Sequence, residues 1–557
     1  MTEHRNNTIS PASANGGPPP ALTVPTLGEA LVRAARLPGS GHLTYIAEDG
    51  SESRQTYAEL LQDASLILTG IRGHEDGPVP GDRVLVQIDH APSLLAAFWA
   101  CVLGGFVPVP VSADPPPAAG MSAANLLAGV WGVLGRRAWV VTGDDPGATT
   151  PVDATWSRAW AERLLGSVTE LRRCAPAPER QAAFHRADPD DVAVLLLTSG
   201  STGLPKAVRL THRNILSRAV AATGVRGLTT ANRSFNWMPL DHVGGLAMFH
   251  VRDVLLGCHQ VHANHRWVIA DPLRWLAAMS RHRSHSTWAP NFAFGLINDR
   301  AQDLAGQSWD LSQLGYIMNG GEAVKARIAR RFLAFLAPFG LPGTAIHPGW
   351  GMSETSAGVV ESVFDPESSS DEDRFVSLGR PHPGVELRVV DERGAILPEG
   401  TVGRLQVRGA AITAGYDNNP EQNRQTFTDD GWFKSGDLAF IRDGELTVTG
   451  RADDIIEVGG VSYHSHEIEA VVEEMSFVEP SYTVVCPDGA ADSAGLLIFL
   501  HLRPGTDHEL AEREVGRHVS DRFGTRHVRV IHVDRDEVPK TGIGKLKRAQ
   551  LLQRYEP

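Results

Sequence analysis

The chain has 557 residues, of which 42% are hydrophobic and 21% are charged. Because this length exceeds what one hydrophobic core usually serves, the composition predicts a globular protein of two or more domains. The formal net charge of −13 argues against a nucleic-acid-binding surface, which needs clustered lysine and arginine side chains.

The first part of the chain predicts alternating helices and strands. Residues 1–25 are rich in proline, asparagine, serine and glycine, and we expect them to be disordered. Amphipathic helices are predicted over 27–37 and 55–73, and buried strands over 82–89, 137–143 and 191–200. Such alternation is typical of an α/β architecture with a mostly parallel sheet.

The uncharged stretch 94–111 is just long enough to be mistaken for a membrane span. The pair Gly104-Gly105 interrupts it, and Pro108 and Pro110 follow. We therefore predict a buried helix over 94–103 followed by a buried strand, and no membrane span.

The pattern changes after about residue 380 to short strands with glycine- and proline-containing turns, as in a small β subdomain. From Ser462 onward, helices and strands predict a separate α+β unit, and we place the boundary near Ala452–Asp454. The predicted fold class is a large α/β N-terminal domain, with parallel-sheet subdomains and a small β subdomain, and a smaller α+β C-terminal domain. The predicted segments are 1–25 (disordered), 26–452 (with the β subdomain at 380–450) and 453–557.

A run of small and hydroxyl-bearing residues follows the strand predicted over 191–200. Backbone N–H groups of a glycine-rich turn can converge on phosphate oxygens, hydroxyls add donors, and a lysine adds positive charge. The residues so assigned are Thr198, Ser199, Gly200, Ser201, Thr202, Gly203 and Lys206. The loop matches neither the P-loop nor the dinucleotide-binding glycine pattern. An ordinary serine/glycine turn is the alternative.

Five further motifs follow in order along the chain. They are Asn-Gly-Gly-Glu-Ala at 319–323, Gly-Trp-Gly-Met-Ser-Glu-Thr-Ser at 349–356, Ser-Gly-Asp-Leu-Ala-Phe at 435–440, Gly-Arg-Ala-Asp-Asp at 450–454 and Pro-Lys-Thr-Gly-Ile-Gly-Lys-Leu-Lys-Arg at 539–548. Taken singly, each has a plain alternative, such as a turn, a helix cap or a solvated surface. Together with the loop, they resemble the signature of the adenylate-forming superfamily, which includes acyl-CoA synthetases, adenylation domains of peptide synthetases, fatty acyl-AMP ligases and luciferases.

The resemblance implies ATP and Mg²⁺ as cofactors. The loop would hold the β- and γ-phosphates of ATP. Trp350 stands in place of the family's tyrosine and would stack on adenine, Ser353 would contact the α-phosphate, and Glu354 would bind Mg²⁺, because a hard cation takes carboxylate and phosphate oxygens. Asp437 and Arg451 would bind the ribose hydroxyls. Gly321, Glu322 and Gly351 complete the expected ATP/AMP site.

The same resemblance implies a catalytic lysine on a mobile C-terminal domain. Lys545 aligns with the family's lysine, whose ammonium would stabilise the negative charge that develops when a carboxylate attacks the α-phosphorus. Asp453 would be the hinge about which the domain turns. Gly459 and Gly460 would line the tunnel that admits a thiol.

The stretch 235–257 resembles the family's substrate-helix region, where His242 would act beside the reacting carboxylate; a core histidine is the alternative. Val243 stands where amino-acid-activating relatives carry an aspartate. Because burying an unpaired ammonium is costly, an amino acid substrate is disfavoured. The expected acid pocket comprises His242, Val243, Gly245, Met248, Asn319, Gly320 and Met352, and Gly244, Gly245 and Met248 suggest room for an apolar or bulky acid.

The resemblance therefore implies an ATP-dependent carboxylic acid ligase of secondary metabolism. It would form an acyl-adenylate and pyrophosphate, then transfer the acyl group to the phosphopantetheine thiol of CoA or of an acyl carrier protein. The alternatives are a ligase restricted to a carrier protein, a luciferase-like oxidation of the adenylate, and a non-catalytic nucleotide-binding homologue. Four widely spaced cysteines without a Cys-x-x-Cys pair predict no disulfide framework and favour a reducing cytoplasm.

Overall fold

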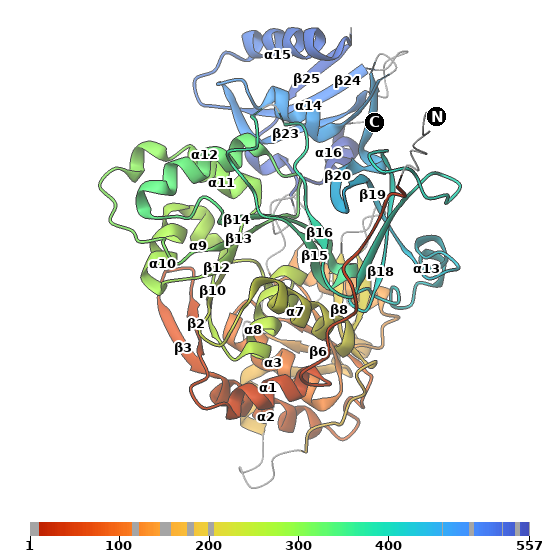
Figure 1. The fold of residues 1–557 in the computed structure, drawn as a ribbon. Helices are drawn as coiled ribbons and strands as arrows, with labels where there is room; N and C mark the ends of the chain where they lie inside the picture. Colours follow the sequence, from red (N-terminus) through yellow and green to blue (C-terminus); the bar gives the residue numbers. More distant parts are fainter. Residues whose placement is uncertain are drawn as a thin grey trace, which may run out of the picture.

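The computed structural model of the protein describes residues 10–113, 122–144, 157–174, 183–198, 205–371, 373–458, 461–488, 495–525, 527–540 and 546–555. A large α/β domain is followed by a smaller domain at the C-terminus, drawn in blue in Figure 1, which confirms the predicted fold class.

The largest sheet has nine strands; it is parallel in its centre and antiparallel at both edges. In spatial order its strands are β16 (Arg380–Pro381), β15 (Ala357–Glu361), β14 (Ile346–Met352), β13 (Tyr316–Asn319), β12 (Ser286–Trp288), β10 (Arg233–Asn236), β11 (His259–Ala263), β2 (His42–Ile46) and β3 (Glu52–Thr56). The helices of this part of the chain are α7 (His212–Arg226), the π-helix η5 (Gly244–Val251), α8 (Arg252–Leu256), α9 (His265–Ala270), α10 (Leu273–His282), α11 (Asn291–Asn298) and α12 (Ala326–Leu336).

A second parallel sheet has four strands in the order β5 (Val107–Pro110), β4 (Arg83–Gln87), β6 (Trp139–Thr142) and β7 (Leu164–Ser167). The helices near it in sequence are α1 (Leu27–Arg36), α2 (Tyr57–Arg72), α3 (Ala91–Gly104), α4 (Ala123–Val133), α5 (Ser157–Ala161) and α6 (Val168–Cys174). The apolar stretch 94–111 forms the buried helix α3 and then β5, as predicted. Within the described ranges, no helix has both the length and the apolar character to cross a membrane.

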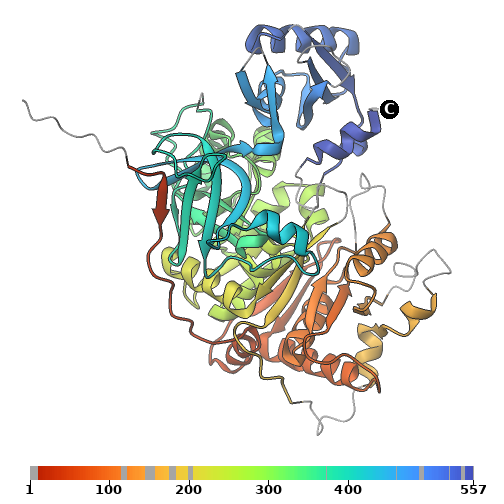
Figure 2. The same ribbon diagram turned by 90° about the vertical axis from the view of Figure 1, so that its right-hand side faces the viewer.

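A five-stranded antiparallel sheet has the order β1 (Ser13–Asn15), β17 (Val385–Val390), β18 (Gly403–Gly409), β19 (Phe433–Arg442) and β20 (Glu445–Arg451), with α13 (Pro420–Thr426) beside it. The expectation that residues 1–25 are disordered is wrong for residues 10–25. The strand β1 pairs with β17, and the Ala12 amide donates to Leu397 O at 2.7 Å. Figure 2 shows β1, in red, beside the teal strands. Local composition missed this strand because its partner is almost the whole length of the large domain away in sequence.

The C-terminal elements have hydrophobic clusters of their own. After the short turn η9 (Ala452–Asp454) come β21 (Ile455–Val458), β22 (Val461–His464), α14 (Ser465–Val472), β23 (Val478–Asp488), β24 (Gly495–Leu502), α15 (His508–Phe523), β25 (Val528–His532) and α16 (Arg548–Tyr555). Strand β24 pairs antiparallel with β23 and parallel with β25. These elements lie above the large domain in both ribbon views (Figures 1 and 2).

Candidate active site

The hydroxyl-rich loop joins the two strands of a hairpin. Strands β8 (Val192–Thr198) and β9 (Lys206–Thr211) pair antiparallel, with Thr198 opposite Lys206. In a P-loop, by contrast, the phosphate-binding turn leads from a strand into a helix. The side chains of Thr198 and Lys206 are therefore fixed at the base of the loop. Ser199, Gly200, Ser201, Thr202 and Gly203 lie outside the described residues, so their assignment remains a prediction.

A tight turn between β14 and β15 carries the tryptophan and the glutamate of the third motif. The two strands pair antiparallel with an irregularity between Trp350 and Gly351, and the 3₁₀ turn η8 (Ser353–Thr355) joins them. A side chain on Gly351 would overlap the backbone at Ala357, so only glycine allows this approach. The turn places Trp350 at one end and buried Ser353 and Glu354 at the other.

At the Glu354 end of this turn, a carboxylate, a tyrosine and a lysine come together. Glu354 is 4% exposed and accepts a hydrogen bond from Tyr416 Oη at 2.8 Å. The Lys206 ammonium lies 5.4 Å from the centroid of the Tyr416 ring. Burial raises the pKa of Glu354, and Glu354 forms no ion pair within the described part of the chain. This carboxylate therefore suits a divalent cation that also contacts phosphate oxygens.

Tyr416 was not among the residues predicted from the sequence. It lies 62 residues beyond Glu354, in a turn region, and no spacing rule links the two. Only the packing of that segment against β9, where Val208 and Tyr416 form an isolated bridge, brings them together.

At the other end of the turn, Asp437 receives two donors. Trp350 Nε1 donates to Asp437 Oδ2 at 2.9 Å, and Arg451 Nη1 donates to Oδ1 at 3.0 Å. Asp437 and Arg451 are paired residues on the neighbouring strands β19 and β20, so the sheet register sets their contact. The indole N–H of Trp350 thus fixes the carboxylate, a role that the sequence did not suggest; its stacking on adenine remains a prediction.

The Asn-Gly-Gly-Glu motif follows the end of β13. Asn319 is fully buried and donates from Nδ2 to Ala289 O at 2.8 Å, while its Oδ1 has no hydrogen-bond donor among the described residues. Glu322 Oε1 accepts from the Phe292 amide at 3.0 Å. Gly320 and Gly321 lie between them, Gly321 with a left-handed φ of +88°. The motif thus presents a buried, unpaired oxygen at the end of a central parallel strand.

The predicted substrate helix is a π-helix, a form often found at functional sites. His242 Nδ1 accepts from the Gly244 amide at 3.1 Å, and Val243 and Met248 are buried. The glycines do not provide the expected room for an acid. Side chains on Gly244 and Gly245 would overlap Met238 and the backbone of Pro239, so these glycines permit close packing instead.

The remaining predicted residues are placed as follows. Met352 ends β14, where its amide donates to Thr355 Oγ1 at 2.9 Å. Asp453 is exposed in η9, directly after β20. Lys545, Gly459 and Gly460 lie outside the described residues, so no contact tests their assignment.

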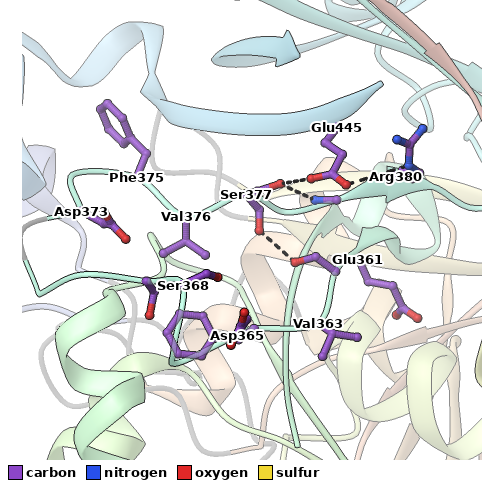
Figure 3. A pocket seen from close by; sticks show the side chains of 14 residues that line it. Glu361, Val363, Asp365, Ser368, Asp373, Phe375, Val376, Ser377, Arg380 and Glu445 are labelled. Carbon is purple, nitrogen blue, oxygen red and sulfur yellow. Dashed lines mark hydrogen bonds and ion pairs between the residues drawn. The ribbon is translucent and has the colours of Figure 1, made fainter. Parts of the chain in front are cut away.

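Two cavities lie away from the predicted residues. The first, of about 410 Å³, lies between β15, β16 and the loop that joins them; Figure 3 shows Ser377, Glu445 and Arg380 in its wall. The second, of about 390 Å³, is lined by β4, β5 and β8 and includes His185 and His212. Neither is lined by a residue of the predicted site.

Most of the large domain matches the model of a known enzyme family. The model described as AMP-binding enzyme matches residues 32–417. A relative named aspulvinone E synthetase, from Aspergillus terreus, is 32% identical over 550 residues, which are 94% of this chain and 57% of the relative. An atromentin synthetase from Tapinella panuoides is 30% identical over 558 residues, 95% of this chain and 56% of the relative. The chain thus spans little more than half the length of these curated relatives.

Solved structures of adenylation domains are also similar. The structure of McyG A-PCP complexed with phenylalanyl-adenylate is 36% identical, with a TM-score of 0.89 and coverage of 98% of this chain and 84% of that one. A multidomain structure of a keto acid-selecting NRPS module is 37% identical, with a TM-score of 0.89 and coverage of 99% and 47%. An adenylation domain of a keto acid-selecting NRPS module, bound to keto acyl adenylate, is 35% identical, with a TM-score of 0.73 and coverage of 98% and 99%.

Proposed function

Because the chain belongs to the AMP-binding enzyme family and is an adenylate-forming enzyme of secondary metabolism, we propose that it activates a carboxylic acid without an α-ammonium group. A carboxylate oxygen attacks the α-phosphorus of ATP, the bond to the β-phosphate oxygen breaks, and pyrophosphate leaves. A thiolate then attacks the acyl carbon of the adenylate, forming a thioester and releasing AMP.

The arrangement around the β14–β15 turn carries the proposal. Lys206 and the loop that begins at Thr198 hold the β- and γ-phosphates, and Asp437 and Arg451 hold ribose. Glu354 would hold Mg²⁺, which neutralises phosphate charge when it is bound. The supporting observation is that one short turn carries both Glu354 and Trp350. Glu354 is a buried carboxylate bound by Tyr416, whose ring lies near the Lys206 ammonium, and Trp350 donates to Asp437, which Arg451 also binds.

We infer a keto acid as the substrate class, because two similar structures are of keto acid-selecting modules and Val243 is an apolar, buried residue. Amino acids are the second candidate, because another similar structure holds phenylalanyl-adenylate. Acid-dependent ATP–pyrophosphate exchange with phenylpyruvate and with phenylalanine separates the two. Exchange with phenylalanine alone would overturn the keto acid assignment.

The thiol acceptor is proposed to be a phosphopantetheinylated carrier protein, with CoA as the alternative. The supporting observation is that the curated relatives are nearly twice as long as the matched region and that one similar structure is of an A-PCP protein. Thioester formation measured with a carrier protein and with CoA, after the same adenylation step, distinguishes the two acceptors.

Lys545 and Asp453 are proposed to serve the two steps in turn: Lys545 supports adenylation, and the C-terminal domain then turns about Asp453 to present Gly459 and Gly460 to the thiol. The Lys545→Ala variant is expected to lose ATP–pyrophosphate exchange but to retain thiolysis of a supplied acyl-adenylate. Equal loss of both reactions would contradict this division of roles. Absence of exchange with every acid of a broad panel would favour a non-catalytic nucleotide-binding protein.

A further inference from the structure

Arg218 is a buried guanidinium in the middle of α7. It is 1% exposed and links two elements of the candidate acid site. Its Nε donates to Gly358 O on β15 at 2.9 Å, and its Nη1 donates to Met248 O on the π-helix η5 at 3.3 Å. These contacts hold the guanidinium between the substrate helix and the β14–β15 hairpin.

No carboxylate neutralises Arg218 within the part of the chain that the structure describes. The neighbouring buried arginines each pair with a carboxylate, Arg226 with Glu361 and Arg252 with Asp253, although the Nη1 atom of each also has no acceptor among the described residues. Burial, Arg226 and Arg252 lower the pKa of Arg218 to about 9, so the side chain still carries its charge at neutral pH. Its Nη2 atom is buried and has no acceptor among the described residues. Leaving a buried charged donor unpaired is unfavourable. A ligand that places an acceptor atom at Nη2 would therefore gain binding free energy.

The free nitrogen lies beside Gly358 on strand β15. It is 3.9 Å from the position that a Cβ on Gly358 would take, and the terminal methyl group of Met318 lies 2.6 Å from the same position. Gly358 pairs with Gly351 across the hairpin, and the Met318 methyl group also lies 3.5 Å from the Cβ position of Gly320. The Met318 methyl group therefore lies close both to Gly358, which Nη2 adjoins, and to Gly320 of the Asn-Gly-Gly motif. A methionine is unbranched and adapts its shape readily, so it can move aside for a ligand.

We propose that Arg218 is a specificity-determining residue that donates from Nη2 to an oxygen atom of the substrate acid at the end remote from the reacting carboxylate. This inference rests on the proposed function and adds that the acid carries a second, distal oxygen. A hydroxyl group and a second carboxylate both supply the required acceptor.

The test compares acids in sets of three that share one skeleton: the parent acid, its terminal hydroxy derivative and its terminal carboxylate derivative. Hexanoate, phenylacetate and phenylpyruvate serve as parents, with the para position substituted in the aryl sets. Binding to the full chain in the presence of AMP is measured by calorimetry, and adenylation by pyrophosphate exchange. We expect one oxygenated member of a set to bind at least about tenfold more tightly than its parent, as for a hydrogen bond to a charged group.

The variant Arg218→Gln should remove this preference, so that the oxygenated member of a set and its parent bind with equal affinity. Arg213→Gln, which removes a partly exposed arginine at the start of the same helix, is the matched control and should keep the preference. Equal binding of all three members to the unmodified protein, or binding of none, overturns the inference even if Arg218→Gln does not fold. Acids that bind with the expected preference but support no exchange would overturn the proposed function and not this inference.

Discussion

The carboxyl group of Glu354 should make the Mg²⁺ requirement depend on pH. Burial raises its pKa, so the group takes up a proton at a higher pH than an exposed glutamate does. A protonated carboxyl group cannot hold the cation, and proton and metal therefore compete. Below this pKa, the Mg²⁺ concentration for half-maximal exchange should rise by about tenfold per pH unit. The measurement is a Mg²⁺ titration of pyrophosphate exchange at several pH values.

Two variants distinguish the titration of the Glu354 carboxyl group from that of other groups. Glu354→Gln should need more Mg²⁺ at every pH and lose this part of the pH dependence. Tyr416→Phe removes the hydrogen bond that favours the ionised carboxylate, so the rise in Mg²⁺ requirement should begin at a higher pH. An unchanged pH dependence in Glu354→Gln would show that another group is responsible.

The indole nitrogen of Trp350 should contribute to nucleotide binding independently of its ring. Trp350→Phe keeps an aromatic face and removes the donor that holds Asp437 Oδ2, while Arg451 still holds Oδ1. We expect the KM for ATP to rise by about tenfold, the effect of one hydrogen bond to a charged group, with little change in kcat. Steady-state kinetics with saturating acid measure this, and an unchanged KM would mean that the contact does not orient the aspartate for ribose.

Some site residues could not be predicted because their contacts are made only by the tertiary structure. The motifs pointed to Glu354 and Asp437, since each lies in a short local pattern. Tyr416 and Arg218 have no such pattern; they contact Glu354 and Gly358 because α7 and the segment after β18 pack against the β14–β15 hairpin. A glycine in the sequence can indicate either room for a ligand or close packing of the backbone. At Gly245 it is close packing, because the backbone of Pro239 occupies the place of a side chain.

Helices were more predictable than edge strands because their signals are local. Helix α2 begins with a capping box between Thr56 and Glu59 and ends at Gly73, all visible in the sequence. Strand β1 has no such signal, because it depends on backbone hydrogen bonds to β17. Buried apolar runs thus predicted β4, β5 and β6 of the four-stranded sheet and β8 of the hairpin, but no strand of the nine-stranded sheet and not the strand that depends on a distant partner.

A buried hydrogen-bond network on strand β11 and η5 should make stability depend on pH. Trp99 Nε1 donates to His250 Nε2 at 2.8 Å, and His250 and His262 both contact Gln260 Oε1, at 2.9 and 2.8 Å. Both histidines are neutral, since each must donate from one ring nitrogen and accept at the other. Burial lowers the pKa of His250 to about 4 and that of His262 well below 6.5.

These lowered values imply that stability falls with acidification. The unfolded chain binds protons at these histidines near pH 6.5 and the folded chain does not, so the free energy of unfolding decreases as the pH drops from about 6.5 to about 4. Between pH 7 and pH 5 each histidine should account for a loss of about 2 kcal/mol. Urea unfolding at the two pH values measures it. His74→Gln, at an exposed position, should leave the dependence unchanged, and an increase in stability on acidification would contradict the neutral network.

Across the whole molecule, ion pairs join the large domain to the start of the C-terminal domain. Lys325 contacts Glu473 at 3.0 Å, Arg327 contacts Glu474 at 3.5 Å, and Arg374 binds Glu467 through two hydrogen bonds. In each pair the base belongs to the large domain and the acid lies on or just after α14. The arrangement favours this orientation of the two domains, and we expect it to accompany one step of the reaction only.

Charge reversal should therefore affect the two steps unequally. Lys325→Glu places two like charges at the contact with Glu473 and should slow acid-dependent pyrophosphate exchange several-fold, while thiolysis of a supplied acyl-adenylate should not slow. The double variant Lys325→Glu/Glu473→Lys recreates the pair with its signs exchanged and should restore exchange.

Added salt should weaken the Lys325–Glu473 contact less than it would weaken a fully exposed ion pair, because Glu473 is largely buried and salt screens buried charges less. Salt should therefore slow exchange by the native protein only slightly. If the double variant were as slow as the single one, the attraction between these two side chains would not be what holds the domains in this orientation.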